Sequence, residues 1–105
     1  MGYKKIYNDT TITATSGGKG IDVAVLDTGV YKDHPDLTRR IADCKDFTKR
    51  GVKPGCADGN GHGTHVSGTI LADGGSDGLG IYGVAPEANL FAYKVCNNAG
   101  ICWEG

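Results

Sequence analysis

The sequence predicts an α/β fold in which parallel strands form a central sheet. Three segments support this fold class. IDVAVL, residues 21–26, is a short apolar and β-branched run typical of a buried parallel strand. Residues 62–72 are predicted to form a helix, and NLFAYKV, residues 89–95, is predicted to form a further strand. A strand, a crossover containing a helix and another strand, in that order, favour a parallel pair.

The remaining segments are predicted to be mostly irregular. Residues 3–19 form a polar lead-in that ends in the flexible sequence TSGGKG. Residues 31–58 are rich in polar and turn-forming residues, and Pro35 in DHPDL disfavours helix at the residue before it. CKDF, residues 44–47, predicts a second short strand, and residues 73–83 form a loop.

The predicted helix is composed of residues with poor helix propensity. It contains two glycines and several β-branched residues, which disfavour an isolated helix. Burial would compensate for this disadvantage. We therefore expect a central helix packed on all sides, with glycines where neighbours approach closely. The residues concerned are Gly63, Thr64, Val66, Gly68, Thr69 and Ile70.

Composition limits the classes of partner. The 105 residues correspond to one ordinary domain. Eleven basic and twelve acidic residues give a net charge of -1, so neither nucleic acid nor an anionic membrane is an expected partner. No apolar stretch approaches the ~20 residues of a membrane span, and MGYKKIYNDT lacks the apolar centre of a signal peptide.

Four cysteines fall into two local pairs. Of the three possible connectivities, we favour Cys44 with Cys56 and Cys96 with Cys102. These disulfides would place the parent protein in an oxidising compartment. Four reduced, partly buried thiols are the alternative.

The histidines at positions 62 and 65 raise the question of a metal site. They would share a helix face, and Cys44 and Cys56 are the obvious further ligands. These cysteines are 12 positions apart, however, well beyond the gap of roughly two to four residues in common structural zinc sites. The spacing therefore argues against zinc.

A catalytic role is better supported for His62. At the first turn of a helix, the positive end of the helix dipole disfavours imidazolium and keeps the ring neutral near pH 7. Gly61 and Gly63 leave room beside the ring, whereas His65 precedes apolar residues and is expected to be buried and hydrogen-bonded. Asp27 follows the first strand, where it can orient His62 and stabilise its charged form. Taken alone, Asp27 also suits a turn or a helix cap, and Asp58 and Asn60 suit either a polar turn or a loop that presents the base.

No serine is suitably placed to complete this pair as a nucleophile. GGSDG around Ser76 fits the G-x-S-x-G pattern, but that elbow needs a strand before it, a helix after it and a later histidine. No histidine follows Ser76. Ser67 lies on the predicted buried helix and Ser16 in the flexible lead-in.

These motifs together resemble the subtilisin-like serine peptidases (subtilases, peptidase family S8). VAVLDTGVYKDHPDL resembles the segment with the catalytic aspartate of that family, here Asp27. DGNGHGTHVSGT resembles the segment with the catalytic histidine, and His62 corresponds to it. GVAPEANLFAYKV resembles the loop and strand that follow.

The resemblance implies a three-layer α/β fold, with a central parallel sheet flanked by helices, of which this chain is the N-terminal portion. It also implies a secreted enzyme with a removable leader and an inhibitory propeptide. Such an enzyme cleaves peptide or protein substrates through an acyl-enzyme and needs no organic cofactor.

Further sites are implied residue by residue. Asp36 matches a calcium ligand of many members, and Asp77 with the carbonyls of Leu79 and Ile81 would complete a site of hard oxygen ligands. This loop departs from the common length of the family, and SDG is equally good turn chemistry. The substrate strand of the family would lie along Ala99, Gly100 and Ile101, with Trp103 close by.

The family's nucleophilic serine and its oxyanion-binding asparagine have no counterpart before Gly105. We therefore expect residues 1–105 to be one N-terminal fragment of a catalytic domain, inactive alone, that depends on the remainder carrying the serine. Unpaired sheet edges would make such a fragment unstable or prone to association. The alternatives are a non-catalytic calcium-stabilised binding module and an aspartate-nucleophile phosphotransferase, although the latter usually has a second Asp where Gly29 stands.

Overall fold

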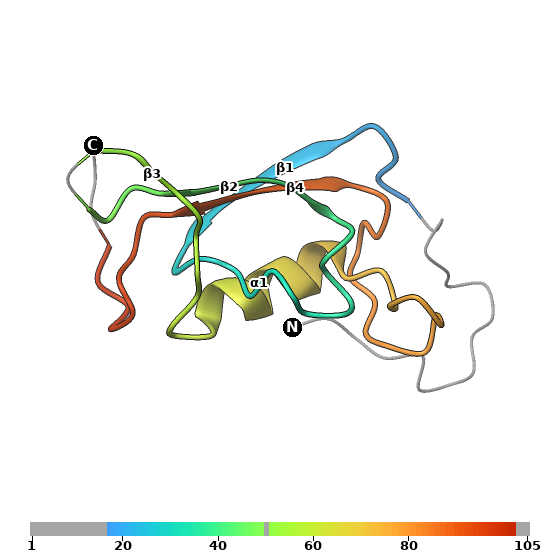
Figure 1. Cartoon of the computed structure of the whole chain (residues 1–105). Coiled ribbons are helices and arrows are strands. Elements are labelled where there is room, and N and C mark those ends of the chain that lie inside the picture. Colours follow the sequence, from blue (N-terminus) through green and yellow to red (C-terminus); the bar gives the residue numbers. More distant parts are fainter. Residues whose placement is uncertain (1–16, 50, 103–105) are drawn as a thin grey trace.

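The computed structural model describes residues 17–49 and 51–102. It contains β1 (Asp22–Asp27), β2 (Ile41–Asp46), β3 (Lys53–Pro54), α1 (His62–Leu71) and β4 (Asn89–Lys94). The four strands form one sheet in the order β1-β4-β2-β3, and α1 lies against one face of it (Figure 1). Most of the expected polar lead-in, residues 3–19, is outside the described residues.

The central strand of the parallel part is β4. It pairs in parallel with β1 on one side and with β2 on the other, which confirms the predicted parallel sheet. In this register Lys94 is opposite both Asp27 and Asp46, at the carboxyl ends of the three strands. Parallel strands end together at this edge, where α/β proteins place their sites.

Two strands differ from the sequence-based expectation. β2 begins at Ile41, earlier than the predicted residues 44–47, because a bulge between Ile41 and Asp43 lets pairing with β4 start sooner. β3 was not predicted because Lys53–Pro54 has no apolar signal. It pairs antiparallel with β2 at the end of the sheet order, a position that tolerates proline.

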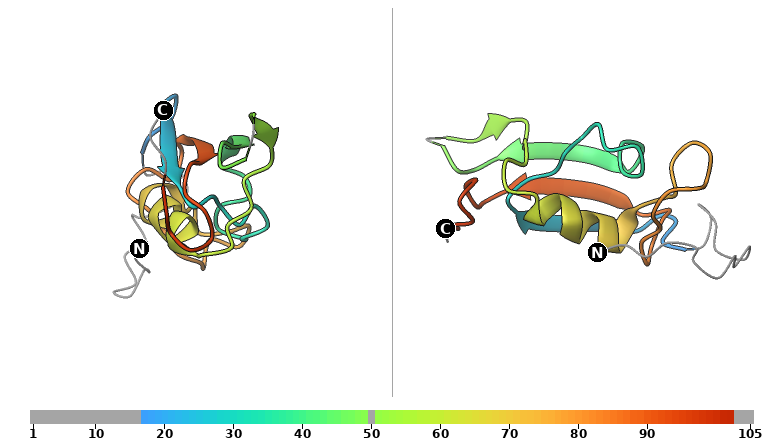
Figure 2. Two further views of the ribbon diagram at one scale, coloured as in Figure 1. Left: turned by 90° about the vertical axis from the view of Figure 1, so that its left-hand side faces the viewer. Right: turned by 90° about the horizontal axis from the view of Figure 1, so that it is seen from below.

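The residue range of the helix was predicted correctly, but its burial was not. α1 starts at His62 and ends at Leu71, with Gly61 as its N-cap residue at φ 100°. Only Gly63, Ser67 and Leu71 are fully buried, and these residues form one stripe along the helix. The expectation of a helix packed on all sides is therefore wrong for the described residues. α1 contacts β1 and β4 with one face (Figure 2).

The core lies between α1 and the sheet. One predicted close approach is present, because a Cβ on Gly63 would stand 2.0 Å from the carbonyl oxygen of Gly29. Gly68 has no such neighbour within 4 Å. The buried apolar side chains here include Val25, Val30, Leu37, Leu71 and Leu90.

Both favoured disulfides are present. Cys44–Cys56 links β2 to the segment before α1, and Cys96–Cys102 closes the loop after β4. Across the described residues, no helix has the length and apolar character needed to cross a membrane.

Candidate active site

Asp27 and His62 are in contact across 35 positions of sequence. The ring Nδ1 of His62 lies 2.8 Å from Oδ1 and 2.9 Å from Oδ2 of Asp27. An ionised carboxylate only accepts hydrogen bonds, so this contact requires a proton on Nδ1, and in the neutral ring Nε2 is then the acceptor. The Asp27 side chain is 14% exposed and that of His62 is 65% exposed. The sheltered carboxylate therefore orients an imidazole ring that is itself open to solvent.

The turn before α1 is organised around Asp58. Its Oδ1 accepts hydrogen bonds from the hydroxyl of Thr28 and from the backbone N–H groups of Asn60 and Gly61. Its Oδ2 accepts from both the backbone N–H and the hydroxyl of Thr64, at 2.9 and 2.6 Å. Asp58 thus organises the turn directly before His62, which is consistent with both roles left open by the sequence.

This network alters the acidity of Asp58. Partial burial acts to raise the pKa of the carboxyl, but hydrogen bonds from Thr64, Gly61 and Thr28 outweigh that effect. Together they lower the pKa of Asp58 from 3.8 to about 2. The group is therefore ionised at any pH at which His62 could act as a base.

Thr28 connects the segment that bears Asp27 to the helix turn that bears His62. Its backbone N–H donates to Oδ1 of Asp27 at 2.7 Å, and its hydroxyl accepts from the N–H of Gly63 at 2.8 Å. The end of β1 and the first turn of α1 are thereby held together. The sequence-based reasoning missed Thr28 and Thr64; the only available signal was their placement next to the proposed acid and base.

A cleft of about 310 Å³ lies over the pair. Its lining includes Asp27 and His62 together with Gly100 and both cysteines of the Cys96–Cys102 disulfide. Asn60 connects the turn before α1 to the loop of residues 96–102, because its side-chain amide donates to the carbonyl oxygen of Asn98 at 3.1 Å. Of the proposed substrate-binding residues, Gly100 therefore shares a cleft with the acid and base.

The loop that contains Ala99, Gly100 and Ile101 is folded as a tight turn. The side chain of Asn97 accepts from the N–H groups of Ala99 and Ile101, and its carbonyl accepts from that of Gly100. All three amides are therefore used within the turn. Trp103, expected nearby, lies outside the described residues.

His65 and Gly63, both on α1 with His62, have different environments from those predicted. His65 is exposed, not buried, and no described residue hydrogen-bonds its ring. The reason is that the stripe through Gly63 faces the sheet and leaves His65 on the other side of α1. Gly63 is itself buried against Gly29, so it provides close packing and not room for a substrate.

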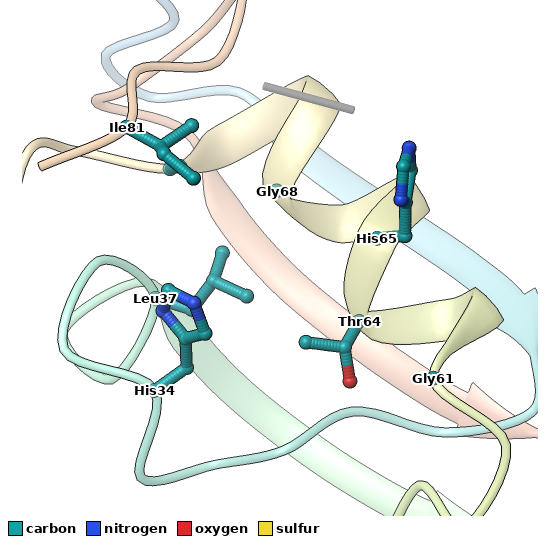
Figure 3. A pocket seen from close by; sticks show the side chains of 8 residues that line it. His34, Leu37, Gly61, Thr64, His65, Gly68 and Ile81 are labelled. Atoms are coloured by element: carbon teal, nitrogen blue, oxygen red, sulfur yellow. The ribbon is translucent and has the colours of Figure 1, made fainter. Parts of the chain in front are cut away.

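His65 instead borders a second cavity, of about 300 Å³. Figure 3 shows His34 and Leu37 on the loop after β1, opposite the part of α1 that bears Thr64 and Gly68. In the described part of the chain, no group of three or more His, Cys, Asp or Glu side chains is placed to hold a metal ion. His62 and His65 therefore do not form part of such a cluster.

Neither described serine is placed to act with His62. The Ser67 side chain is buried, and its Oγ has no hydrogen-bond partner. Ser76 follows the far end of α1, and a ten-residue helix is ~15 Å long. Ser16 lies outside the described residues.

Two of the residues expected to bind calcium lie close to Gly75. A Cβ there would be 3.0 Å from Oδ1 of Asp36 and 3.7 Å from Oδ1 of Asp77. The Asp36 carboxylate is buried and accepts at Oδ2 from the N–H of Ile81 at 2.9 Å, and no cationic side chain among the described residues pairs with it. The carbonyl of Ile81 accepts from the N–H of Gly74, whereas Leu79 is 84% exposed. A buried carboxylate that has no cationic partner among the described residues and lies near a second carboxylate fits a hard cation.

Comparison with known proteins agrees with this geometry. The model of the subtilase family matches residues 18–103. A subtilisin of Bacillus sp. (strain TA39) is 56% identical over 101 residues, which cover 94% of this chain and 24% of that protein. An intracellular serine protease of Paenibacillus polymyxa is 51% identical over 85 residues, covering 79% of this chain and 26% of that protein.

Solved structures give the same result. Sphericase superposes with a TM-score of 0.82 at 58% identity and covers 93% of this chain. The S41 psychrophilic protease superposes with a TM-score of 0.81 at 54% identity. In both cases the match spans 32% of the solved chain. The fold and the matched sequence together show that this chain belongs to the subtilase family of serine peptidases.

Proposed function

We propose that this chain is the N-terminal part of a catalytic domain that hydrolyses peptide bonds through an acyl-enzyme. The contact between His62 and Asp27 is the observation that supports this function best. His62 takes a proton at Nε2 from a serine hydroxyl as it attacks the scissile carbonyl, and then returns the proton to the leaving amine. Asp27 stays ionised, holds the Nδ1–H tautomer and stabilises the imidazolium.

The serine belongs to the remainder of the domain, so the 105-residue chain alone is inactive. The placement of Ser67 and Ser76 supports this part of the proposal. The partners are therefore a peptide or protein substrate, the remainder of the domain and an inhibitory propeptide. The two disulfides favour a secreted protein.

The substrate lies in the cleft between His62 and the loop of residues 96–102. The amides of Ala99, Gly100 and Ile101 are used within their turn. A substrate strand would therefore pair with backbone carbonyl oxygens of this loop. Main-chain hydrogen bonds of this kind suit an extended peptide of varied sequence.

Calcium stabilises the fold at a site away from the reaction. Asp36 and Asp77 would hold it, with carbonyl oxygens of Leu79 and Ile81, and its charge would compensate the buried Asp36 carboxylate. Thermal melts with calcium and with a chelator test this. Calcium should raise the Tm of the chain and not that of Asp36→Asn, and an equal Tm for the wild-type chain under both conditions would contradict the site.

A chimera tests the proposed reaction. This chain replaces the matching segment of the TA39 subtilisin, and hydrolysis of a chromogenic peptide is measured. The chimera should be active, and Asp27→Asn should lower kcat about 10⁴-fold by removing the correct tautomer. Asp22→Asn is the matched control, because Asp22 lies on the same strand but bonds only the exposed side chain of Asn89.

The 105-residue chain is tested separately with a fluorophosphonate probe, which labels activated serines. No labelling is expected for the chain alone, and labelling of the chimera is expected. A labelled chain would contradict the assignment of the serine to another segment. A chimera whose activity survives Asp27→Asn would contradict the proposed role of the acid–base pair.

A further inference from the structure

Lys94 is a buried cation directly behind the candidate active site. It ends β4, is 6% exposed, and is the one buried Lys or Arg within residues 17–49 and 51–102. Its Nζ lies 3.1 Å from the carbonyl oxygen of Thr28, 2.8 Å from that of Ala57 and 2.5 Å from Oδ1 of Asn98. An ammonium group has three protons, so these acceptors saturate its charged form.

The three acceptors belong to three different parts of the site. Thr28 directly follows Asp27, and Ala57 directly precedes Asp58, whose carboxylate holds the turn that presents His62. Asn98 lies in the disulfide-closed loop that walls the cleft. A single charged group therefore contacts the turn of the acid, the turn of the base and the loop opposite them.

The acceptors are also unusual for a buried cation. All three are neutral amide oxygens, and no carboxylate in the described part of the chain forms a direct ion pair with Lys94. Asp46, opposite Lys94 on β2, interacts with its charge without a direct contact. A buried charge without a direct ion pair is costly, and a neutral side chain could fill the same space. Few backbone hydrogen bonds join these segments: the N–H of Val30 donates to the carbonyl of Cys56, and the N–H of Cys96 donates to that of Asp27. The presence of Lys94 is explained if its directional, charge-assisted hydrogen bonds are needed to fix the segments further.

We propose that Lys94 is a positioning residue that sets the placement of Asp27, His62 and the loop of residues 96–102 relative to one another. This role rests on the proposed peptidase function but not on the location of the serine. Lys94 does not reach the reacting atoms. It acts through the carbonyls of Thr28 and Ala57 on the acid–base pair, and through Asn98 on the substrate side of the cleft.

The tautomer of His62 reports the first of these effects without any catalysis. In the wild-type chain, nitrogen-15 NMR should show His62 protonated at Nδ1, as its contact with Asp27 requires. Lys94→Met removes three donors and keeps an unbranched apolar side chain, so both tautomers should appear. Lys45→Met is the matched control, because it removes the same charge from an exposed position.

A second variant separates the effect of Lys94 on the loop of residues 96–102 from its effect on the acid–base pair. It also tests the proposal if Lys94→Met does not fold. Asn98→Ala removes one acceptor and leaves both carbonyls bound. The backbone amides of residues 98–101 should then exchange with solvent about tenfold faster, as expected for the loss of one charge-assisted bond, while the His62 tautomer is unchanged. In the chimera, Asn98→Ala should raise KM and leave kcat, whereas Lys94→Met should change both.

The results distinguish this proposal from the proposed function. A folded Lys94→Met chain with the wild-type His62 tautomer would overturn the positioning role, whatever the activity of the chimera. If that variant does not fold, unchanged amide exchange in Asn98→Ala would overturn it. An inactive chimera with the expected tautomer changes would contradict the peptidase assignment and leave the role of Lys94 in place.

Discussion

The backbone of Gly63 packs directly against that of Gly29, so that a Cβ on Gly63 would be 2.0 Å from the Gly29 carbonyl oxygen. This contact brings the first turn of α1 against the turn that follows Asp27. Because the opposing atom is backbone, it cannot move aside as a flexible side chain would. The separation between the candidate acid and base therefore depends on a residue without a side chain.

Gly63→Ala should destabilise the chain and displace His62 from Asp27. Overpacking of this kind costs about 1–3 kcal/mol. Gly68→Ala is the matched control on the same helix, because nothing within 4 Å opposes a Cβ there. It should stabilise the chain by about 0.5–1 kcal/mol through helix propensity. Urea unfolding of both variants measures the difference, and equal midpoints would contradict the close contact.

Lowering the pH should reduce the free energy of unfolding of the chain, because Asp58 becomes protonated. Its pKa is about 2 in the folded chain, compared with 3.8 for an unperturbed carboxyl. A lowered folded-state pKa means that the stabilisation is complete above pH 4 and is lost as the pH falls toward 2. Asp58→Asn should remove this part of the pH dependence and destabilise the chain near pH 7 by about 1–3 kcal/mol, because its amide faces hydrogen-bond donors.

The measurement is the free energy of unfolding between pH 2 and 6. Asp33→Asn serves as the control, since Asp33 is an exposed acid in the turn after β1. A wild-type and an Asp58→Asn chain with parallel pH profiles would show that the Asp58 network contributes nothing to the acid sensitivity.

Asp73 should be important for stability beyond the site. It is 2% exposed and accepts from Arg39 at 2.7 Å, with Nε of Arg40 at 3.3 Å. Asp73→Asn leaves two guanidinium groups without their counter-ion and should cost about 2–4 kcal/mol. Asp43→Asn breaks only an exposed pair with Lys45 and should cost under about 0.5 kcal/mol. Similar thermal shifts for the two variants would contradict this ranking.

The two disulfides should differ in their reactivity. Cys102 is exposed, whereas Cys56 is 1% exposed, so a mild reductant should open Cys96–Cys102 first. Alkylation followed by mass spectrometry identifies the order of reduction. Opening Cys96–Cys102 should loosen the loop beside the cleft, and reduction of Cys44–Cys56 first would contradict the exposure argument.

The isolated chain should associate at high concentration. β1 ends the sheet order and therefore presents an unpaired edge among the described residues, and Ile21 and Leu26 beside it are more than half exposed. Light scattering should show mass that rises with concentration, and Ile21→Lys should reduce it. A monomer with a cooperative thermal transition would contradict this expectation.

The sequence alone identified the features that local pattern determines. Asp27 was proposed as the acid because it follows an apolar strand, and His62 as the base because a turn rich in glycine precedes a helix; the structure places the two side chains in contact. The disulfide pairing was also local, since each pair closes a short loop. Features of this kind depend on residues close together in the chain, so they can be predicted from the sequence.

The tertiary structure decided which groups hold the pair in place. Small and β-branched residues occur all around α1, so its sequence does not specify which face meets the sheet. The contact of Gly63 with Gly29 makes that choice, and it leaves His65 exposed. The roles of Thr28 and Lys94 likewise come from contacts across 35 and 66 positions, and composition holds no signal for such distant partners. The sequence thus determined the chemical groups, and long-range packing determined their geometry.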